Sequence, residues 1–364
     1  MTVLTGMNSD YNDNSQIQLQ AAMHFLPWLE DALSNGSHML PFNHSPLISY
    51  ADYGCATGSN TAQLFAKIKK LLESTRALGG DGGADHLQVF LVDLPSNDWN
   101  QVAATFFKPG AVASGELILP VMVPRSFYAG ECASPGTLHI GTSCDAAQWL
   151  QHVPPVSYKD SFCYKDAGKA AQEAFKRQFE NDFDHFLRLR AREFAVNGVL
   201  FVVVPGSLGS SHVGEGFFTA FNDAALEMCS KGDIDSSLLA DCMFPIYIPT
   251  EDELESVAHR TASWEVLQRG GVALSDMWDE YKSTGDAASY AKTMRNVFFS
   301  IAGPLLQSRL ALSDAKTKEM FDRGETLIRQ NPSKYMWRNI QVAVLLRRIR
   351  PRRSMDFGRR SIDV

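Results

Sequence analysis

The chain has 364 residues, of which 45% are hydrophobic and 21% charged, a composition typical of a globular protein with a large apolar core. Its net charge of −7 argues against a dedicated nucleic-acid-binding protein. We find no secretory leader pattern and no apolar run as long as a membrane span. Six scattered cysteines without a CxxC pair, and nine histidines without metal-ligand spacing, predict a cytoplasmic protein with reduced thiols and no metal site.

The first strong structural signal is a strand, a tight turn and a helix. Residues 47–51 form an apolar run typical of a buried strand, and residues 52–58 supply a turn with two glycines. A helix is predicted over residues 60–74, where apolar side chains recur on one helical face. Three further strands are predicted at residues 88–92, 117–123 and 137–141.

A long helix is predicted next, over residues 171–195, with phenylalanines at helical spacing. We expect Asn197-Gly198 to end it, because glycine fits the left-handed conformation of a helix C-cap. Residues 199–204 then form a continuous apolar strand. Strands that are separated by helices and buried on both faces predict a parallel, doubly wound α/β sheet.

The last third of the chain is mainly helical. Residues 207–232 are rich in aromatic side chains, and Thr250 with Glu253 forms the capping-box pattern that opens a helix. Residues 263–268 and 339–346 are candidates for strands that return to the sheet. The helical stretch between these two strands is predicted to belong to a cap.

The glycine turn has the residues expected of a cofactor site. In a doubly wound sheet, ligands bind outside the carboxyl ends of the strands, where Asp52 and Asp93 are both expected. Gly54 and Gly58 allow close approach of a ligand, and the helix that begins near Asn60 directs free N–H groups at the same space. The carboxylate, ammonium and ribose of S-adenosylmethionine match this set, whereas a dinucleotide would prefer GxGxxG. Taken alone, the pattern also fits an ordinary turn.

Six segments of the sequence are each too short to identify a family, but their order and spacing along the chain are specific when taken together. They are residues 11–18, 51–60, 93–100, 123–128, 138–150 and 179–191. Together they resemble the SABATH family of plant-type carboxyl methyltransferases, which includes salicylate, benzoate and jasmonate methyltransferases and caffeine-pathway N-methyltransferases. Beyond residue 204 the match is carried only by residues 247–250 and 294–297.

The resemblance implies a class I methyltransferase fold, which is a Rossmann-like, doubly wound α/β sheet with an α-helical cap, usually in a homodimer. It implies S-adenosylmethionine as the cofactor and a small-molecule carboxylic acid as the substrate, with neither nucleic acid nor membrane as a partner. Residues 47–205 would form the cofactor-binding core, completed by about 259–275 and 334–350. The helical cap and substrate-binding segments would be residues 1–46, 206–258 and 276–333, followed by a basic tail at 351–364.

Carried over residue by residue, the resemblance also implies the cofactor contacts. The expected residues are Ser15, Asp52, Gly54, Asn60, Asp93, Leu94, Ser126 and Phe127. Ser15, Asp52 and Asn60 would hold the methionine end, and Asp93 the ribose hydroxyls. Leu94 would pack on the adenine, whose other side Ser126 and Phe127 would line. Without the family register, the two serines also fit turn or capping positions, and Phe127 fits the core.

For the substrate, Gln18 and Trp149 match the pair that grips the carboxylate, with Tyr11 beside them. Phe218 and Trp337 match aromatic walls of the pocket, although these two placements depend on the thin part of the match. An ordinary core position would also explain Trp149, Phe218 and Trp337.

Two pocket residues depart from the family pattern. Asp145 stands where many relatives have a tyrosine, and Gln148 replaces a usually apolar residue. A carboxylate in the pocket costs desolvation free energy unless it is paired. The departure suggests a substrate with a cationic or multiply hydroxylated end, or a wetter pocket.

The implied reaction is an in-line SN2 displacement that gives a methyl ester. A carboxylic acid is already ionised at neutral pH, so we assign no general base, and Gln18 and Trp149 would act by positioning the acid. His139 is better explained as a structural residue than as a base. The alternatives are N- or phenol O-methylation on the same scaffold, and a non-catalytic homologue that only binds the cofactor.

Overall fold

The computed structural model describes residues 15–35, 45–79, 83–107, 110–111, 117–156 and 161–350. Its centre is a seven-stranded sheet in the order β3-β2-β1-β4-β5-β9-β8. Strands β1 to β5 run parallel, whereas β9 is antiparallel to both β5 and β8. The strands are β1 (Leu47–Tyr53), β2 (His86–Asp93), β3 (Ile118–Pro124), β4 (Leu138–Cys144), β5 (Phe194–Pro205), β8 (Trp264–Leu274) and β9 (Asn339–Arg348). The predicted α/β sheet is therefore confirmed.

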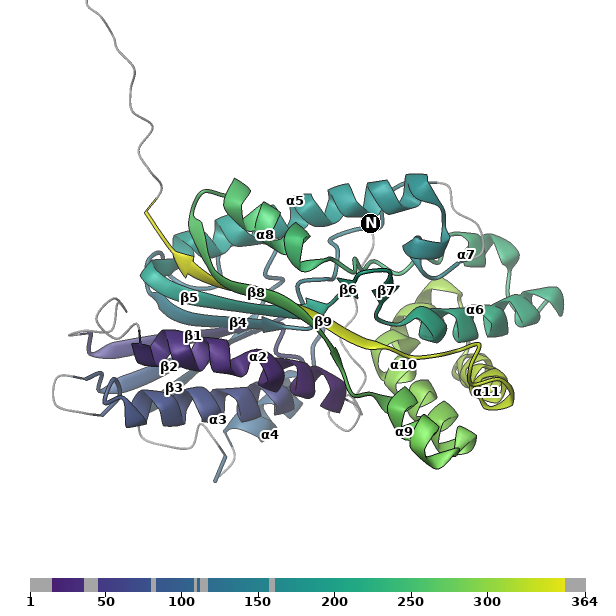
Figure 1. Ribbon diagram of the computed structural model, residues 1–364, viewed down its shortest axis with the longest axis horizontal. Helices are drawn as coiled ribbons and strands as arrows, with labels where there is room; N and C mark the ends of the chain where they lie inside the picture. Colours follow the sequence, from purple (N-terminus) through teal and green to yellow (C-terminus); the bar gives the residue numbers. More distant parts are fainter. Residues whose placement is uncertain are drawn as a thin grey trace, which may run out of the picture.

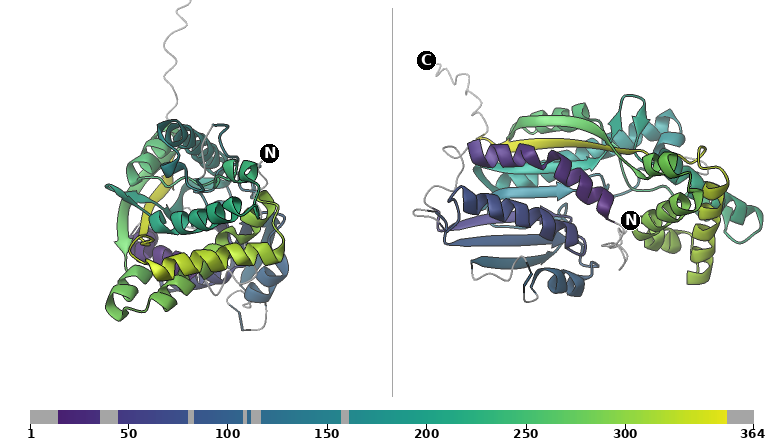
Figure 2. Two further views of the ribbon diagram at one scale, coloured as in Figure 1. Left: turned by 90° about the vertical axis from the view of Figure 1, so that its right-hand side faces the viewer. Right: turned by 60° about the horizontal axis from the view of Figure 1, so that its bottom comes forward.

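Helices cover both faces of this sheet (Figures 1 and 2). One face carries α2 (Gln16–Asn35), α3 (Ser59–Ser74) and α4 (Trp99–Phe106), and the other carries α5 (Lys169–Glu193) and α8 (Glu251–Arg260). Each face has its own apolar core. On β5, the neighbours Val202 and Val203 are buried in opposite cores, because successive side chains of a strand point to opposite faces.

A helical cap lies beyond the carboxyl ends of the parallel strands, on the right in Figure 1. It contains α6 (Glu215–Ser230), α7 (Ser236–Ala240), α9 (Met277–Thr284), α10 (Ala287–Arg309) and α11 (Asp314–Gln330). The short elements η1 (Tyr164–Asp166), β6 (Ser207–Leu208) and β7 (Ser211–His212) complete the described chain. Because ligands bind at the carboxyl edge of such a sheet, the cap covers the expected site.

Two helices expected in the cap lie against the sheet instead. Residues 1–46 and 206–258 were assigned to the cap, but α2 buries Phe25 and Leu29 in the core beside α3. Helix α8 buries Leu254 and Val257 against β8, β9 and α5. The capping box of Thr250 with Glu253 does open α8, as predicted. Both helices carry an apolar stripe, which shields a sheet face from water.

The long helix α5 ends at Glu193, two residues before the predicted end at residue 195. Phe194 is already extended and pairs with Leu138 of β4. Asn197 has a φ of 72° and lies where the register between β4 and β5 shifts. Asn197-Gly198 therefore forms an irregularity within β5 rather than the helix cap that the sequence pattern suggested.

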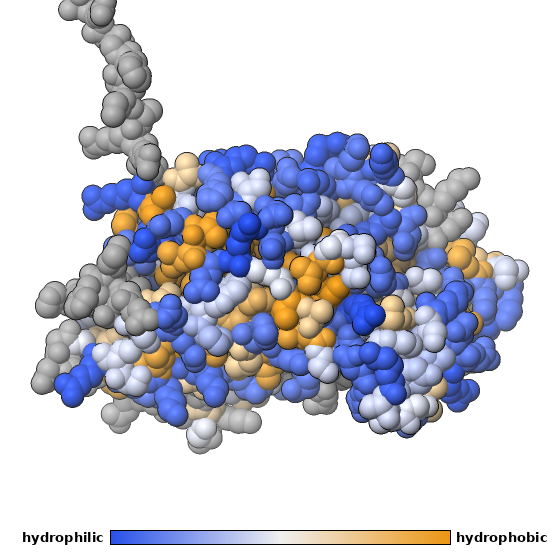
Figure 3. Space-filling model, in the orientation of Figure 1, coloured by the Kyte–Doolittle hydropathy of each residue, from blue (hydrophilic) through white to orange (hydrophobic). Residues whose placement is uncertain are grey.

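The face seen in Figure 3 is mainly hydrophilic, with hydrophobic residues gathered across its middle, in the region of β8 and the β6–β7 hairpin. Strand β8 is an edge strand with mostly half-buried side chains, and Leu208 of the hairpin is 41% exposed. Across the described ranges, we find no helix with the length and apolar character that a membrane crossing requires.

Candidate active site

The turn between β1 and α3 lies at the carboxyl edge of the sheet. The amides of Gly54 and Cys55 donate to the carbonyl oxygen of Val92, at 2.8 and 3.1 Å, which holds the turn against β2. Gly54 has a φ of 98°, and a Cβ there would lie 2.2 Å from the Cβ of Ala146. Glycine is therefore required twice, for the backbone conformation and for the contact with the loop after β4.

Asp52 is buried at the end of β1 and ties three elements together. Its carboxylate accepts a hydrogen bond from the hydroxyl of Thr61 on α3 and another from that of Thr142 on β4, each at 2.6 Å. Burial raises the pKa of Asp52, and the two hydroxyl donors oppose that rise. The carboxylate is thereby fixed beside the glycine turn.

Asp93 is at the end of β2 and holds the same turn from the other side. Its carboxylate accepts from the amides of Ala56 at 2.6 Å and Leu94 at 2.7 Å. Asn97 donates to the carbonyl oxygen of Ala56 at 2.6 Å. Burial raises the pKa of Asp93 to about 6, although both backbone donors favour the ionised form.

A cavity lies against this turn and the beginning of α3. It is lined by Gln18, Ala22, Asp52, Gly54, Cys55, Ala56, Gly58, Ser59, Asn60, Thr61, Leu64 and Cys144. The N-cap of α3 is Gly58, and no side chain of the described residues caps the first N–H groups of this helix. Ser15 and Asn60 are joined by hydrogen bonds of 3.3 and 3.0 Å, which fix the beginning of α2 against α3. Uncapped N–H groups beside buried carboxylates suit a ligand with a carboxylate and positively charged or hydroxyl groups.

The segment after β3 completes this edge. Pro124 pairs with Asp93, so Ser126 and Phe127 follow immediately beyond the end of β2. The carbonyl oxygen of Phe127 accepts from the buried Arg190 at 2.9 Å, and Arg190 forms an ion pair of 2.8 Å with Glu193. This buried pair anchors the segment to α5.

A second cavity lies between the sheet edge and the cap. Its lining residues are Gln18, Asp145, Gln148, Trp149, Pro205, Val213, Gly214, Phe217, Phe218, Phe244, Ile246, Tyr247, Ile248, Phe298, Ile301 and Trp337. Gln18 lines both cavities, and Cys144 of the first cavity directly precedes Asp145 of the second. The two cavities therefore meet near Gln18 and Asp145, which is where a group could pass from one ligand to the other.

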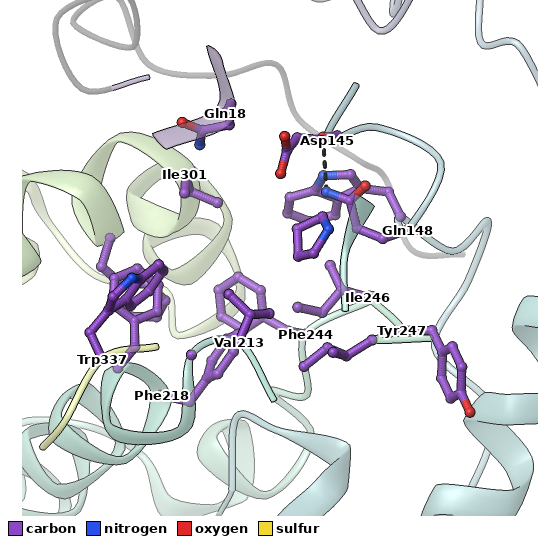
Figure 4. A pocket seen from close by; sticks show the side chains of 16 residues that line it. Gln18, Asp145, Gln148, Val213, Phe218, Phe244, Ile246, Tyr247, Ile301 and Trp337 are labelled. Atoms are coloured by element: carbon purple, nitrogen blue, oxygen red, sulfur yellow. Dashed lines mark hydrogen bonds between the residues drawn. The ribbon is translucent and has the colours of Figure 1, made fainter. Parts of the chain in front are cut away.

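Polar side chains gather at one end of the second cavity. Figure 4 shows Gln18, Asp145 and Gln148 around one side, with Phe218, Phe244 and Trp337 away from them. Three buried oxygens there, Gln18 Oε1, Asp145 Oδ2 and Gln148 Oε1, have no hydrogen-bond partner among the described residues. Buried polar atoms are rarely left unpaired, which indicates that this end binds a polar group.

Trp149 is held in place through its backbone. Its amide donates to the carbonyl oxygen of Ala146 at 3.1 Å, and its own carbonyl accepts from the hydroxyl of Tyr128 at 2.9 Å. It also pairs with Ile246 in an isolated antiparallel bridge. Trp149 therefore lies on a braced loop with its side chain in the cavity lining.

Aromatic side chains form the other end. The rings of Phe217 and Trp337 are 4.6 Å apart, and those of Phe218 and Phe244 are 5.6 Å apart. Tyr247 turns its hydroxyl away from the cavity, as Figure 4 shows, and donates to Glu253 at 3.0 Å. The indole nitrogen of Trp337 is buried without a partner in the described chain. The body of a ligand would therefore meet a largely apolar wall.

The structure brings the sequence-based candidates together in two groups. Asp52, Gly54 and Asn60 line the first cavity with Ser15 behind them, and Asp93, Leu94, Ser126 and Phe127 lie along the same sheet edge. The second cavity is lined by Gln18, Asp145, Gln148, Trp149, Phe218 and Trp337. Tyr11 lies outside the described residues.

The sequence did not reveal the residues that support these groups. Thr61 and Thr142 orient Asp52, and Phe298 and Ile301 of α10 reach the second cavity.

His139 accepts a hydrogen bond from the amide of Ser49 at 3.0 Å, and burial lowers its pKa to about 4. His139 is the second residue of β4, at the end of the strand away from the site, which agrees with a structural role. Within the described residues, no three His, Cys, Asp or Glu side chains are grouped as a metal site would require.

The sheet order, with the antiparallel β9 and the ligand turn after β1, is that of the class I methyltransferase fold. A family model described as "SAM dependent carboxyl methyltransferase" matches residues 4–349, so the chain belongs to this family, and S-adenosylmethionine is its cofactor. The SABATH resemblance is thereby confirmed, and the chain is a methyltransferase.

Individual relatives agree with this assignment. "Indole-3-acetate O-methyltransferase 1" of Oryza sativa subsp. japonica is 29% identical over 89% of this chain and 86% of its own length. "Probable caffeine synthase 5" of Camellia sinensis is 30% identical over 74% of this chain and 77% of its own. The solved structure "Loganic acid methyltransferase with SAH" has a TM-score of 0.80 and covers 96% of this chain and 99% of that protein, at 20% identity. This last similarity concerns the fold.

Proposed function

We propose that this enzyme transfers the methyl group of S-adenosylmethionine to the carboxylate of a small organic acid and releases a methyl ester. The observation that carries the proposal is the polar end of the second cavity, where Gln18 also borders the first cavity. No Lys or His is among the lining residues that the structure describes, and the carboxyl of Asp145 is the one candidate base other than the Tyr247 hydroxyl, which turns away. An acceptor that is already ionised needs no such base, whereas an amine or phenol would have to lose a proton.

In this proposal, the chain binds the cofactor through the groups at the carboxyl edge. S-adenosylmethionine supplies an electrophilic methyl group on its sulfonium. Asp52, Asn60 and Ser15 hold its methionine end, and the uncapped start of α3 favours a carboxylate there. Asp93 would accept from the ribose hydroxyls, and Leu94, Ser126 and Phe127 would hold the adenine.

The chain orients the acceptor through Gln18 and Trp149. Their amide and indole N–H groups donate to the carboxylate oxygens, so that one oxygen faces the first cavity. Orientation of this kind can lower an activation barrier by about 7–11 kcal/mol in favourable cases. Phe218 and Trp337 form walls for the body of the acid, and the cap excludes water.

The aromatic wall indicates the class of acid. Rings at Phe217, Phe218, Phe244, Phe298 and Trp337 favour an acid with an apolar ring body over a short aliphatic or highly polar one. We take indole-3-acetic acid as the first candidate, because the rice relative is named for that acid. N-methylation is the competing activity, because another relative is named as a probable caffeine synthase.

A direct assay separates these activities. The purified protein is incubated with methyl-labelled S-adenosylmethionine and a panel of carboxylic acids led by indole-3-acetic acid, with methylxanthines and phenols alongside. We expect mass spectrometry to detect label in a carboxylic acid methyl ester. Label only in a methylxanthine or a phenol would assign the enzyme to the competing class.

We also infer a homodimer from the family resemblance. Light scattering should give twice the mass of one chain at micromolar concentration, and a single-chain mass over a wide concentration range would refute the inference. The cytoplasmic location, and the absence of nucleic acid and membrane partners, stay predictions.

A further inference from the structure

Asp145 is the one carboxyl group among the described residues that line the acceptor cavity. Among the described lining residues, the other ionisable group is Tyr247, which turns away to Glu253. The Oδ2 atom of Asp145 is buried, and no described residue forms a hydrogen bond with it. An ionised carboxyl with no cation and no donor beside it is costly in an apolar cavity.

Its position brings a second negative charge close. Asp145 directly follows Cys144 of the cofactor cavity, and Figure 4 shows its carboxyl directed into the acceptor cavity toward the side of Gln18. The proposed function places the carboxylate of the substrate at this same end. Two carboxylates in a cavity to which the described residues bring no cation cannot both stay ionised cheaply, and such pairs commonly share a proton.

We propose that Asp145 is protonated when the acid binds and donates a hydrogen bond to the carboxylate of the substrate. This inference rests on the proposed function. Asp145 is then a neutral donor beside Gln18 and Trp149, and it keeps its proton while the acid presents its other oxygen to the cofactor. The substrate carboxylate becomes the single negative charge in the acceptor cavity, where it faces a positively charged sulfonium.

The groups around Asp145 favour the protonated form. Burial raises its pKa to about 7 before any acid is bound. The titratable neighbour on β4 is Cys144, and burial raises the pKa of its thiol, with further contributions from Asp52 and Asp145. Helix α2 contributes the uncharged Gln18, and the cap contributes apolar side chains, so no described element brings a cation to the carboxyl.

The backbone makes asparagine a suitable replacement. Asp145 has a φ of 54°, and its amide donates to Val203 at 2.8 Å while its carbonyl accepts from Gln148 at 2.8 Å. Asparagine tolerates the left-handed conformation and is isosteric with aspartate. Its side-chain amide donates a hydrogen bond at every pH, so Asp145→Asn mimics the protonated form.

Proton uptake on binding tests the proposal. The protein is saturated with S-adenosylhomocysteine and titrated calorimetrically with indole-3-acetic acid, or with whichever acid of the panel gives the most methyl ester. Titrations in two buffers of different ionisation enthalpy, at pH 6 and at pH 8, give the number of protons bound. With a pKa of about 7, Asp145 is mostly ionised at pH 8 and mostly protonated at pH 6 in the protein without substrate. We therefore expect Asp145 to take up about 0.9 proton per molecule of substrate bound at pH 8, and about 0.1 at pH 6.

The affinity should follow the same equilibrium. We expect binding to be about tenfold weaker at pH 8 than at pH 6, since Asp145 must first regain its proton. Asp145→Asn should bind the acid without proton uptake and with equal affinity at both values of pH. The control is Asp85→Asn, the same change at an exposed carboxyl before β2, which should behave as the wild type.

The outcomes distinguish this inference from the proposed function. An acid that is esterified but binds at pH 8 without proton uptake, or with proton release at pH 6, would show that Asp145 acts in its ionised form. That result would favour a substrate with a cationic or hydroxyl group beside its carboxylate. A panel that yields no methyl ester would overturn the proposed function itself, and this inference with it.

Discussion

Gly54→Ala tests whether the cofactor turn and the acceptor loop depend on each other. The new Cβ would lie 2.2 Å from the Cβ of Ala146, whereas ordinary carbon contacts exceed about 3.4 Å. Either the turn or the loop must therefore move by about 1 Å. A positive φ also costs alanine about 1–2 kcal/mol, which the folded state alone bears.

The consequence should be much larger for activity than for stability. Ala146 lies between Asp145 and Trp149, so its displacement shifts the residues that position the acid. A misplacement of about 1 Å can lower the rate about 100-fold. We expect kcat/KM for methyl ester formation to fall by about that factor, and the free energy of unfolding to fall by about 1–3 kcal/mol.

Gly232→Ala is the matched control for the backbone cost. Gly232 has a φ of 77°, and a Cβ there would meet nothing within 4 Å. This variant should lose about 1–2 kcal/mol of stability in denaturant titration and keep the kcat/KM of the wild type. Should Gly54→Ala fold and stay within about threefold of the wild-type kcat/KM, the close coupling of turn and loop would be wrong.

Three further predictions concern single side chains. Asp93→Ala should weaken cofactor binding about 10- to 150-fold. The affinity of the wild type should fall as the pH drops through about 6, because the ribose hydroxyls need an ionised acceptor. A dissociation constant that calorimetry finds unchanged in the variant would remove Asp93 from the site. Trp149→Phe should lower kcat/KM about tenfold or more with cofactor affinity unchanged, whereas Trp28→Phe, outside both cavities, should leave both intact. Glu193→Ala leaves the buried Arg190 without its ion-pair partner and should cost about 3–5 kcal/mol of stability in denaturant titration; a loss below about 1 kcal/mol would contradict this.

The sequence was most informative where a short segment determines its own structure. The strand, glycine turn and helix around Gly54 follow from local chemistry, since glycine at a positive φ and an apolar helical face can be recognised within a few residues. The same holds for the capping box at Thr250 and Glu253. From parallel strands alone, Asp52 and Asp93 were expected at one edge, where they lie.

Long-range packing limited the rest. Thr142 reaches Asp52 across 90 positions of sequence, and Ile301 lines the acceptor cavity from α10 in the cap. The end of α5 was misplaced because Asn197-Gly198 fits a helix cap equally well. In the structure, strand β5 already begins at Phe194, which pairs with Leu138 of β4 three residues before Asn197.

The chemical nature of the methylated product tests the central proposal most directly. The labelled product of the purified enzyme and its preferred acid is isolated and warmed in dilute base, and the label is followed by mass spectrometry. We predict that base releases the label as methanol and restores the free acid, as a methyl ester requires. A product that keeps its label under these conditions would be an N-methyl compound or an ether, and it would contradict transfer to a carboxylate.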